Sequence, residues 1–273
     1  MSDIWDGVAA SWERNAQFVD AQLQDATQLL LDEAAVTSGD TVIELACGPG
    51  GAGLAAAERI GATGSVLLAD VAPDMVAAAA RRAAAHPNVT TAVFDQLAID
   101  RPDASADAII SRLGLMFAPE PATAVREAAR VLRPDGRYAA MTWGPRSQNA
   151  WLGLILDEVG RQFDIEFPPP EVPGPFSLQD AGGLAAAMGE GGLQDVRVTT
   201  MDAPMRVTSL DDWWERVTSL AGPLTVALAA MEPDVRQAIR ERSLAAGRAA
   251  AQDDGDGLAL TGTVLVASGR RDA

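Results

Sequence analysis

The segment Thr41–Gly53, which reads TVIELACGPGGAG, admits few backbone conformations. Its first part, Thr41–Ala46, is a short apolar run of strand length with β-branched residues near its start. The six positions from Gly48 to Gly53 hold four glycines and a proline, which neither a strand nor a helix interior tolerates. The alanine-rich residues that follow favour a helix. Strand, glycine turn and helix together predict the start of a nucleotide-binding unit, because glycines allow close backbone approach and a helix N-terminus presents unpaired N–H groups.

Apolar runs of strand length alternate with segments of helical periodicity through the middle of the chain. Beyond the first strand we expect strands at 65–69, 88–94, 106–111 and 137–142, helices at 74–85 and 121–132, and a turn at 133–136. This alternation requires crossover connections, and crossovers produce a parallel sheet covered on both faces. The predicted fold class is therefore α/β: a Rossmann-like, open, mostly parallel seven-stranded sheet with helices on both faces and a helical cap.

The chain is expected to form one domain, residues 1–273, in three parts. Residues 1–37 repeat apolar positions at helical spacing and predict an N-terminal helical cover, and residues 38–145 form the cofactor-binding half. Residues 146–273 predict two closing strands with helical cap insertions. In this last part we expect a proline-rich linker at 167–175 and strands at 196–200 and 258–267. Helices are expected at 148–163 and near 223–231 and 233–251. Two more helices are expected to begin at Ser177, with Asp180 as capping partner, and at Ser209, with Asp212 in the same pattern.

Charge and residue usage exclude several partners and chemistries. The formal charge of −17 argues against nucleic acid and anionic membranes as partners, and otherwise serves solubility. One cysteine rules out an internal disulfide, so we predict a cytoplasmic protein, with no signal peptide and no membrane span. The absence of lysine excludes a P-loop lysine, a Schiff-base lysine and a Tyr-x-x-x-Lys pair. His86 is the single histidine, so histidine triads are not expected, and we predict no metal site.

Three carboxylates are expected at the carboxyl ends of three successive strands. The residues from Gly48 also form a literal G-x-G-x-x-G, with Asp70 placed as in a dinucleotide site. Glu44 argues against that interpretation, because dinucleotide-binding strands are normally apolar there and a buried carboxylate needs a partner. Together with Asp95, these acids suit a ligand with an amino group, a ribose diol, an adenine amine and a sulfonium. S-adenosylmethionine has all four groups and is the predicted cofactor.

Four segments resemble the motifs of class I S-adenosylmethionine-dependent methyltransferases. VIELACGPG (42–50) resembles their first motif, in which three residues separate an acid from G-x-G. LLADVAPDM (67–75) is similar to the second motif, which carries the ribose-binding acid, and VFDQLAI (93–99) to the segment with the adenine-side acid. AARVLRPDGRYAAMTW (128–143) resembles the helix, turn and fifth strand. The resemblance implies the predicted fold and a methyltransferase activity.

Three further segments resemble one group within this superfamily. SRLGLMF (111–117), NAW (149–151) and GPFSL (174–178) are similar to a large set of bacterial enzymes related to the methyltransferases of ubiquinone and menaquinone biosynthesis. Acceptors vary widely in that group, so the resemblance does not identify the acceptor.

The resemblance also implies a role for each matching residue. Gly48 and Gly50 would approach the methionine part of the cofactor, and Glu44 would support that turn or bind the amino group. Asp70 would accept from the ribose hydroxyls and Asp95 from the adenine amine, unless these two acids are only turn or cap residues. The predicted cofactor-binding set is Glu44, Ala46, Cys47, Gly48, Gly50, Asp70, Val71, Met75, Asp95, Gln96, Leu97 and Ser111, with Ser111 expected to face the sulfonium.

The acceptor side carries a weaker signal. Its candidate residues are Arg112, Met116, Trp143 and Trp151, with Trp213 and Trp214 as further candidates. Six tryptophans against one tyrosine favour a flat, largely apolar acceptor. Methyl transfer mainly requires alignment and exclusion of water, and no histidine is placed to act as a base, so no catalytic residue is predicted. Trp5 and Trp12 could close over a ligand, although packing against the core is the favoured interpretation.

Two other functions stay open at this stage. A dinucleotide-dependent oxidoreductase is supported by the G-x-G-x-x-G and opposed by Glu44 and the missing lysine. A non-catalytic nucleotide-binding module on the same fold is the second, because fold alone does not determine function. The expected partner is a small-molecule methyl acceptor. The acceptor atom, the pathway and the oligomeric state are undetermined, and a homodimer is left open.

Overall fold

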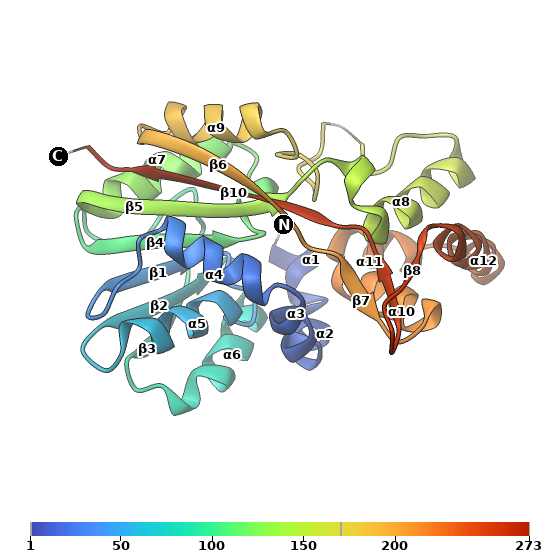
Figure 1. Ribbon diagram of the computed structural model, residues 1–273, viewed down its shortest axis with the longest axis horizontal. Coiled ribbons are helices and arrows are strands. Elements are labelled where there is room, and N and C mark those ends of the chain that lie inside the picture. The colour runs from blue at the N-terminus through green and yellow to red at the C-terminus, as the bar shows by residue number, and fades with distance from the viewer. Residues whose placement is uncertain (1, 170, 273) are drawn as a thin grey trace.

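A seven-stranded sheet in the order β3-β2-β1-β4-β5-β10-β6 forms the centre of the computed structural model, which describes residues 2–169 and 171–272 (Figure 1). Strands β1 to β5 pair in parallel, and β10 runs antiparallel to both of its neighbours. The strands are β1 (Thr41–Leu45), β2 (Ser65–Asp70), β3 (Val89–Val93), β4 (Ala106–Arg112), β5 (Leu132–Trp143), β6 (Gln194–Asp202) and β10 (Thr263–Arg270). The predicted Rossmann-like, mostly parallel sheet is confirmed.

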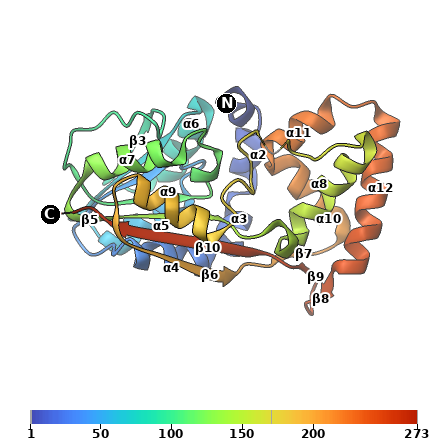
Figure 2. The ribbon, with the colours of Figure 1, turned by 90° about the horizontal axis from the view of Figure 1, so that it is seen from above.

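Helices cover both faces of this sheet. On one face α4 (Gln24–Glu33), α5 (Gly51–Ile60) and α6 (Pro73–Arg82) pack against apolar strand residues, and on the other face α7 (Pro121–Val131) and α9 (Ala181–Glu190) do so. Figure 2 shows α4 and α9 on opposite sides of β10. Because both faces are covered, the central strands read as continuous apolar runs, as parallel strands usually do.

The remaining helices form two groups beyond the carboxyl edge of the sheet. The N-terminal group is α1 (Ser2–Asp6), α2 (Ala9–Arg14) and α3 (Ala16–Gln22). The second group, at the right of Figure 2, is α8 (Ala150–Phe163), α10 (Leu210–Leu220), α11 (Gly222–Ala229) and α12 (Pro233–Ala250). The second group has its own apolar core, in which Trp213 and Ile239 are fully buried. None of the described helices is both long enough and apolar enough to cross a lipid bilayer.

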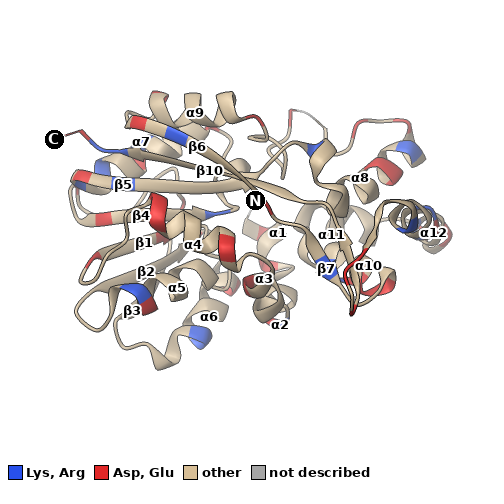
Figure 3. Ribbon diagram, in the orientation of Figure 1, with Lys and Arg blue, Asp and Glu red and all other residues tan. Residues whose placement is uncertain are grey.

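Short 3₁₀ turns and a small second sheet complete the chain. The 3₁₀ turns are η1 (Ala83–Ala85), η2 (Leu115–Phe117) and η3 (Arg146–Gln148). The small antiparallel sheet has the order β7-β9-β8, with β7 (Met205–Val207), β8 (Gln252–Asp253) and β9 (Leu258–Leu260). Figure 3 shows charged residues on the outer helices and at strand ends, with both signs present on α12.

The C-terminal strand differs from the prediction. A single strand at 258–267 was expected, but Leu258–Leu260 belongs to the small sheet and Thr263–Arg270 to the large one. Gly262 separates the two strands and has no room for a side chain, since a Cβ there would lie 2.2 Å from the Ala203 carbonyl oxygen. The prediction of one continuous strand was wrong because the chain passes from one sheet to the other within a single apolar run.

Two further boundaries also differ. The predicted turn at 133–136 lies within β5, where the pairing register shifts: Ala106 pairs with Leu132, but Ala108 pairs with Arg137.

Helix α9 does not begin at Ser177, because Asp180 is its N-cap and accepts a hydrogen bond from Gly183 N. The expected cap at Ser209 is confirmed, since its hydroxyl accepts from Asp212 N. The predicted linker at 167–175 includes Pro170, which lies outside the described residues, as do residues 1 and 273 of the predicted domain.

Candidate functional site

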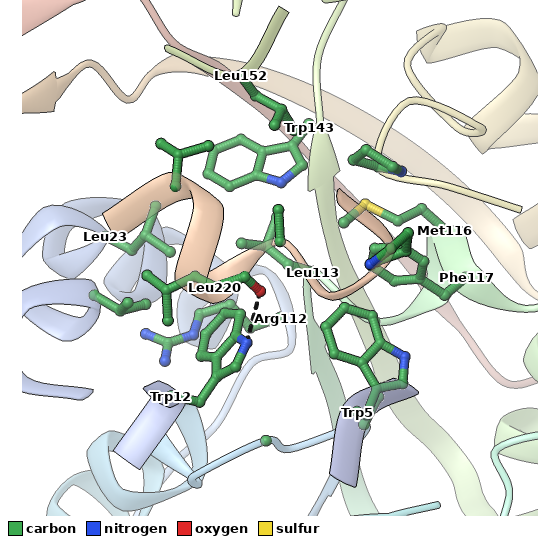
Figure 4. A pocket seen from close by; sticks show the side chains of 18 of the residues that line it. Trp5, Trp12, Leu23, Arg112, Leu113, Met116, Phe117, Trp143, Leu152 and Leu220 are labelled. Carbon is green, nitrogen blue, oxygen red and sulfur yellow. Dashed lines mark hydrogen bonds between the residues drawn. The ribbon is translucent and has the colours of Figure 1, made fainter. Parts of the chain in front are cut away.

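A largely apolar cavity of about 220 Å³ lies at the carboxyl edge of the sheet, between the sheet and both outer groups of helices. Figure 4 shows Trp143 on one side of this space and Trp5 and Trp12 on the opposite side. The predicted site residues that line it are Ala46, Cys47, Gly48, Asp70, Val71, Met75, Gln96, Arg112, Met116, Trp143 and Trp151. The predicted residues absent from its lining are Glu44, Gly50, Asp95, Leu97 and Ser111. The edge chosen from the sequence is thus the edge that carries a cavity.

The glycine turn between β1 and α5 forms one wall of this cavity. Ala46, Gly48 and Gly50 all have positive φ angles, of 51°, 52° and 81°. A Cβ on Gly48 would meet no atom within 4 Å, whereas a Cβ on Gly50 would lie 2.7 Å from Leu68 Cδ1. Gly48 therefore leaves open space for a ligand, and Gly50 allows the turn to pack against β2.

Glu44 lies beneath the turn and supports it from inside. Its side chain is buried, and Oε2 accepts a hydrogen bond of 2.7 Å from Gly53 N in the first turn of α5. Burial raises the pKa of Glu44 to about 7, and the positive charge of Arg112 opposes this rise. A Cβ on Gly53 would lie 2.7 Å from Glu44 Oε2, so residue 53 must be glycine for this contact. Of the two expected roles, the geometry favours support of the turn.

Asp70, at the end of β2, joins the glycine turn to the cavity wall. Oδ2 accepts a hydrogen bond of 2.8 Å from Gly48 N, and Oδ1 accepts one of 3.0 Å from Ala72 N. Burial raises the pKa of Asp70, and these backbone N–H groups oppose the rise. Each carboxylate oxygen keeps a further lone pair, so Asp70 can still accept from a ligand hydroxyl.

The segment after β3 contributes an amide rather than its carboxylate. Asp95 is exposed, lies outside the cavity lining, and its Oδ1 accepts from Leu97 N at 2.9 Å. Gln96 lines the cavity, and its Nε2 donates to the Gly114 carbonyl oxygen at 3.3 Å. Among the described residues, the buried Gln96 Oε1 has no hydrogen-bond partner. Such an acceptor suits an amine-bearing ligand, because a buried polar atom without a partner is costly.

Ser111 and Arg112 end β4 but occupy different surroundings. Ser111 is fully buried outside the cavity lining, and its expected place beside the sulfonium stays a prediction. Successive residues of a strand alternate between the faces of a sheet, and Arg112 is the one that reaches the cavity wall. Arg112 Nη2 donates to Asp20 Oδ1 at 2.7 Å, and Nη1 donates to Thr27 Oγ1 at 3.1 Å.

Asp20, on α3, connects the N-terminal helices to the glycine turn. Its Oδ2 also accepts from Arg82 Nη2 at 2.5 Å, and Arg82 Nη1 donates to the Pro49 carbonyl oxygen at 2.8 Å. A Cβ on Gly51 would lie 1.9 Å from Asp20 Oδ1. The absence of a side chain at Gly51 therefore allows the carboxylate to reach the turn.

Tryptophan side chains dominate the part of the cavity remote from the glycine turn. The rings of Trp143 and Trp151 lie 4.7 Å apart at 59°, and Trp151 Nε1 donates to Asn149 Oδ1 at 3.0 Å. Trp213 and Trp214 are buried in the core of the second helical group and do not line the cavity. Trp213 instead donates its Nε1–H to the Trp151 carbonyl oxygen at 2.6 Å, which fixes the backbone behind the wall.

The N-terminal helices supply residues that were expected mainly to pack. Trp5 and Trp12 both line the cavity. The Trp5 ring meets Phe117 edge-on at 4.9 Å, and Trp12 Nε1 donates to the Leu220 carbonyl oxygen at 2.9 Å. Helical spacing identified these tryptophans as one buried face, but it could not indicate what that face covers. Lining residues that the sequence did not single out include Phe18, Gln22, Leu23, Leu152, Leu156, Phe167, Met205 and Leu224.

The cavity holds few groups that exchange protons. Among the described lining residues, only Cys47, Asp70 and Arg112 are ionisable. Burial raises the pKa of the Cys47 thiol, which makes it a poor nucleophile. His86 lies outside the lining. The arrangement is suited to orienting two molecules and excluding water.

Comparison with known families and proteins gives a consistent picture. A model of the methyltransferase domain family matches residues 42–136. Nocamycin O-methyltransferase from Saccharothrix syringae is 28% identical over 225 residues, covering 77% of this chain and 78% of that protein. An uncharacterised 37.1 kDa protein in transposon TN4556 of Streptomyces fradiae is 33% identical over 139 residues, covering 50% of this chain and 39% of that protein. The chain thus spans well under half of one relative and over three quarters of the other.

Solved structures match the whole fold. The YcgJ protein of Bacillus subtilis has a TM-score of 0.61 at 16% identity, covering 92% of this chain and 99% of that one. Geranyl diphosphate C-methyltransferase from Streptomyces coelicolor A3(2), solved with S-adenosyl-L-homocysteine, has a TM-score of 0.51 at 19% identity, covering 90% of this chain and 79% of that one. At these identities the likeness shows a shared fold.

Proposed function

We propose that this chain is a class I S-adenosylmethionine-dependent methyltransferase that transfers a methyl group to a small, flat and largely apolar molecule. One observation carries the proposal: a single cavity joins the glycine turn to an apolar chamber walled by aromatic rings. A methyl donor at the turn and an acceptor in the chamber would then meet inside one space that is shielded from water.

The donor half of the cavity fits S-adenosylmethionine at three points. The bare Gly48 leaves room for the methionine part, and Asp70 retains lone pairs for the ribose hydroxyls. Gln96 Oε1, an acceptor without a partner among the described residues, would take the adenine amine. Asp95 remains a proposed second acceptor for that amine, although in this structure it binds Leu97 N. Glu44 would act from beneath by holding Gly53.

The acceptor half would bind a flat ring by stacking and exclusion of water. Trp143 and Trp151 come from β5 and α8, and Met116 adds a polarisable thioether to the wall. No ionisable residue accompanies them on that side, which favours an apolar molecule with few charged groups. Two relatives are named nocamycin O-methyltransferase and 2-phytyl-1,4-beta-naphthoquinone methyltransferase, and both names are compatible with such acceptors.

The chain's own residues would act by positioning. The bound donor supplies an electrophilic methyl group on a sulfonium. Trp143 and Trp151 would orient the acceptor, and Trp5 and Trp12 would close the cavity from the N-terminal side. Because the described lining offers no histidine and no free carboxylate besides Asp70, it supplies no general base on the acceptor side, and an acceptor with an acidic proton would have to release it to solvent outside the chamber. We further propose that all three parts of residues 1–273 work as one domain, since the N-terminal, central and C-terminal parts all line the cavity.

The direct test is turnover with a methyl-labelled donor across a panel of quinols, phenols and amines. We expect label in flat, apolar acceptors and little in charged or aliphatic ones. Leu152→Trp, which narrows the chamber, should raise the acceptor KM at least tenfold and leave donor affinity within about threefold. Phe163→Trp at the exposed end of the same helix is the matched control. Donor binding without transfer to any acceptor would favour a non-catalytic module, and tighter binding of a nicotinamide dinucleotide would favour an oxidoreductase.

A further inference from the structure

Arg112 carries a positive charge into a cavity wall that is otherwise almost free of charge. Its side chain is only 7% exposed, and it lines the cavity. A guanidinium has five N–H donors, of which two are used, one on Asp20 and one on Thr27. Among the described residues the other three have no acceptor. A buried cation with unpaired donors facing a cavity is costly, and an anionic ligand would remove that cost.

Arg112 shares its partner carboxylate with a second arginine. Asp20 is the one carboxylate that pairs with it, and the same carboxylate also pairs with Arg82. Two guanidinium groups therefore share the Asp20 carboxylate, and Arg82 has a second acid nearby in Glu13, whose pKa its charge helps to lower. Glu44 also feels the charge of Arg112, but its carboxylate binds Gly53 N and burial favours its neutral form. A further anion bound at the turn would give Arg112 a counter-charge that it does not share with Arg82.

The position of Arg112 indicates which anion. Arg112 Nη2 lies 2.3 Å from the point where a Cβ on Gly51 would stand, so the guanidinium rests directly on the glycine turn. The aromatic acceptor chamber is built instead by β5 and α8, around Trp143 and Trp151. An anion bound by Arg112 therefore belongs to the ligand that occupies the turn.

We infer that Arg112, held by Asp20 and Thr27, binds the α-carboxylate of the methyl donor rather than an anionic group of the acceptor. This rests on the proposed function, because it takes the donor to lie at the glycine turn. Asp20 and Thr27 would then be positioning residues: they leave three N–H groups of Arg112 free and fix the direction of the guanidinium. Selectivity for a donor with an intact amino-acid end would come from this one side chain.

The test measures binding by calorimetry, so it does not depend on finding the acceptor. The two ligands are S-adenosylhomocysteine and its decarboxylated analogue, which differ by the carboxylate alone. We expect wild-type protein to prefer the first, and Arg112→Met to weaken the first by roughly 10- to 100-fold while changing the second by less than about threefold. Arg112→Lys keeps the positive charge but lacks the planar, paired N–H donors of the guanidinium, so it should retain part of the preference for the ligand with the carboxylate. If Arg112→Met does not fold, this lysine variant carries the comparison.

Arg81→Met is the matched control. Arg81 also ties α6 to an N-terminal helix, through a two-fold contact with Glu13, but it is 60% exposed and lies outside the cavity. We expect this control to leave the preference for the carboxylate unchanged. Equal weakening of both ligands in Arg112→Met would overturn the inference, and so would unchanged donor affinity with a raised acceptor KM. Wild-type protein that binds neither ligand would instead overturn the proposed function itself.

Discussion

At the scale of single residues, Asp70 illustrates how one side chain serves both structure and ligand. Its two oxygens hold Gly48 N and Ala72 N, so it shapes the glycine turn while it lines the cavity. We predict that Asp70→Ala weakens donor binding by one to two orders of magnitude, about 1–3 kcal/mol for a lost charge-assisted hydrogen bond. Calorimetry with S-adenosylhomocysteine measures this. Asp74→Ala, at an exposed position in the first turn of the next helix, is the control, and unchanged affinity in a folded Asp70→Ala protein would contradict the ribose assignment.

Glu44 makes stability depend on pH. Its pKa is about 7 in the folded protein against an ordinary value of 4.5, so between these values the folded chain binds more protons than the unfolded chain. The free energy of unfolding should therefore fall as pH rises through that window, by at most about 3 kcal/mol from this group. Below pH 4.5 the group is protonated in both states and costs nothing.

Glu44→Gln isolates that dependence. The amide oxygen can still accept from Gly53 N, but it does not ionise, so the variant should lose less stability than wild type between pH 5 and pH 8. Urea unfolding at both pH values measures the difference, and any pH-independent cost of the amide cancels in the comparison. Parallel pH curves for the two proteins would show that burial does not raise this pKa.

At the scale of elements, the N-terminal helices are attached to the glycine turn through Asp20. This carboxylate bonds Arg82 and Arg112, while α3 carries the cavity residues Phe18 and Val19. We predict that Asp20→Ala speeds amide hydrogen exchange in α1–α3 and leaves the central strands protected, because the change removes side-chain contacts of one helix and no backbone pairing between strands. Mass spectrometry of exchanged peptides measures this. Asp32→Ala is the control, since Asp32 bonds Arg59 on α5 and is largely exposed; equal exchange in both variants would mean that packing alone holds these helices.

At the scale of the whole molecule, the tryptophans divide into two sets. Trp5, Trp12, Trp143 and Trp151 line the cavity, and the remaining two of the six are buried in the second helical core. We predict that an acceptor bound in the chamber changes the intrinsic fluorescence, because it replaces water and stacks beside these rings. Trp143→Phe should remove much of that change, whereas Trp214→Phe should preserve it. An acceptor that is turned over without altering the emission would place its binding site elsewhere.

Much of this architecture follows from local patterns in the chain. The apolar runs and glycine turns predicted β1 to β4 and their helices to within a few residues, because strand alternation and turn chemistry act over short distances. The same reasoning placed Gly48 and Asp70 at one edge, since parallel strands end together. It failed where a single run serves two sheets, at 258–270, and where a turn interrupts a paired strand, at 133–136.

The sequence by itself determined the sheet, the sheet edge that carries the cavity and the type of cofactor, all of which depend on neighbours along the chain. Only the tertiary structure decided what closes that edge. Whether Trp12 faces a core or a cavity, whether Ser111 or Arg112 reaches that cavity, and how Asp20 meets Arg112 at the turn all depend on packing between residues 92 to 208 positions apart. No periodicity encodes such contacts, because helical and strand spacing identify the buried face of an element and not its partner.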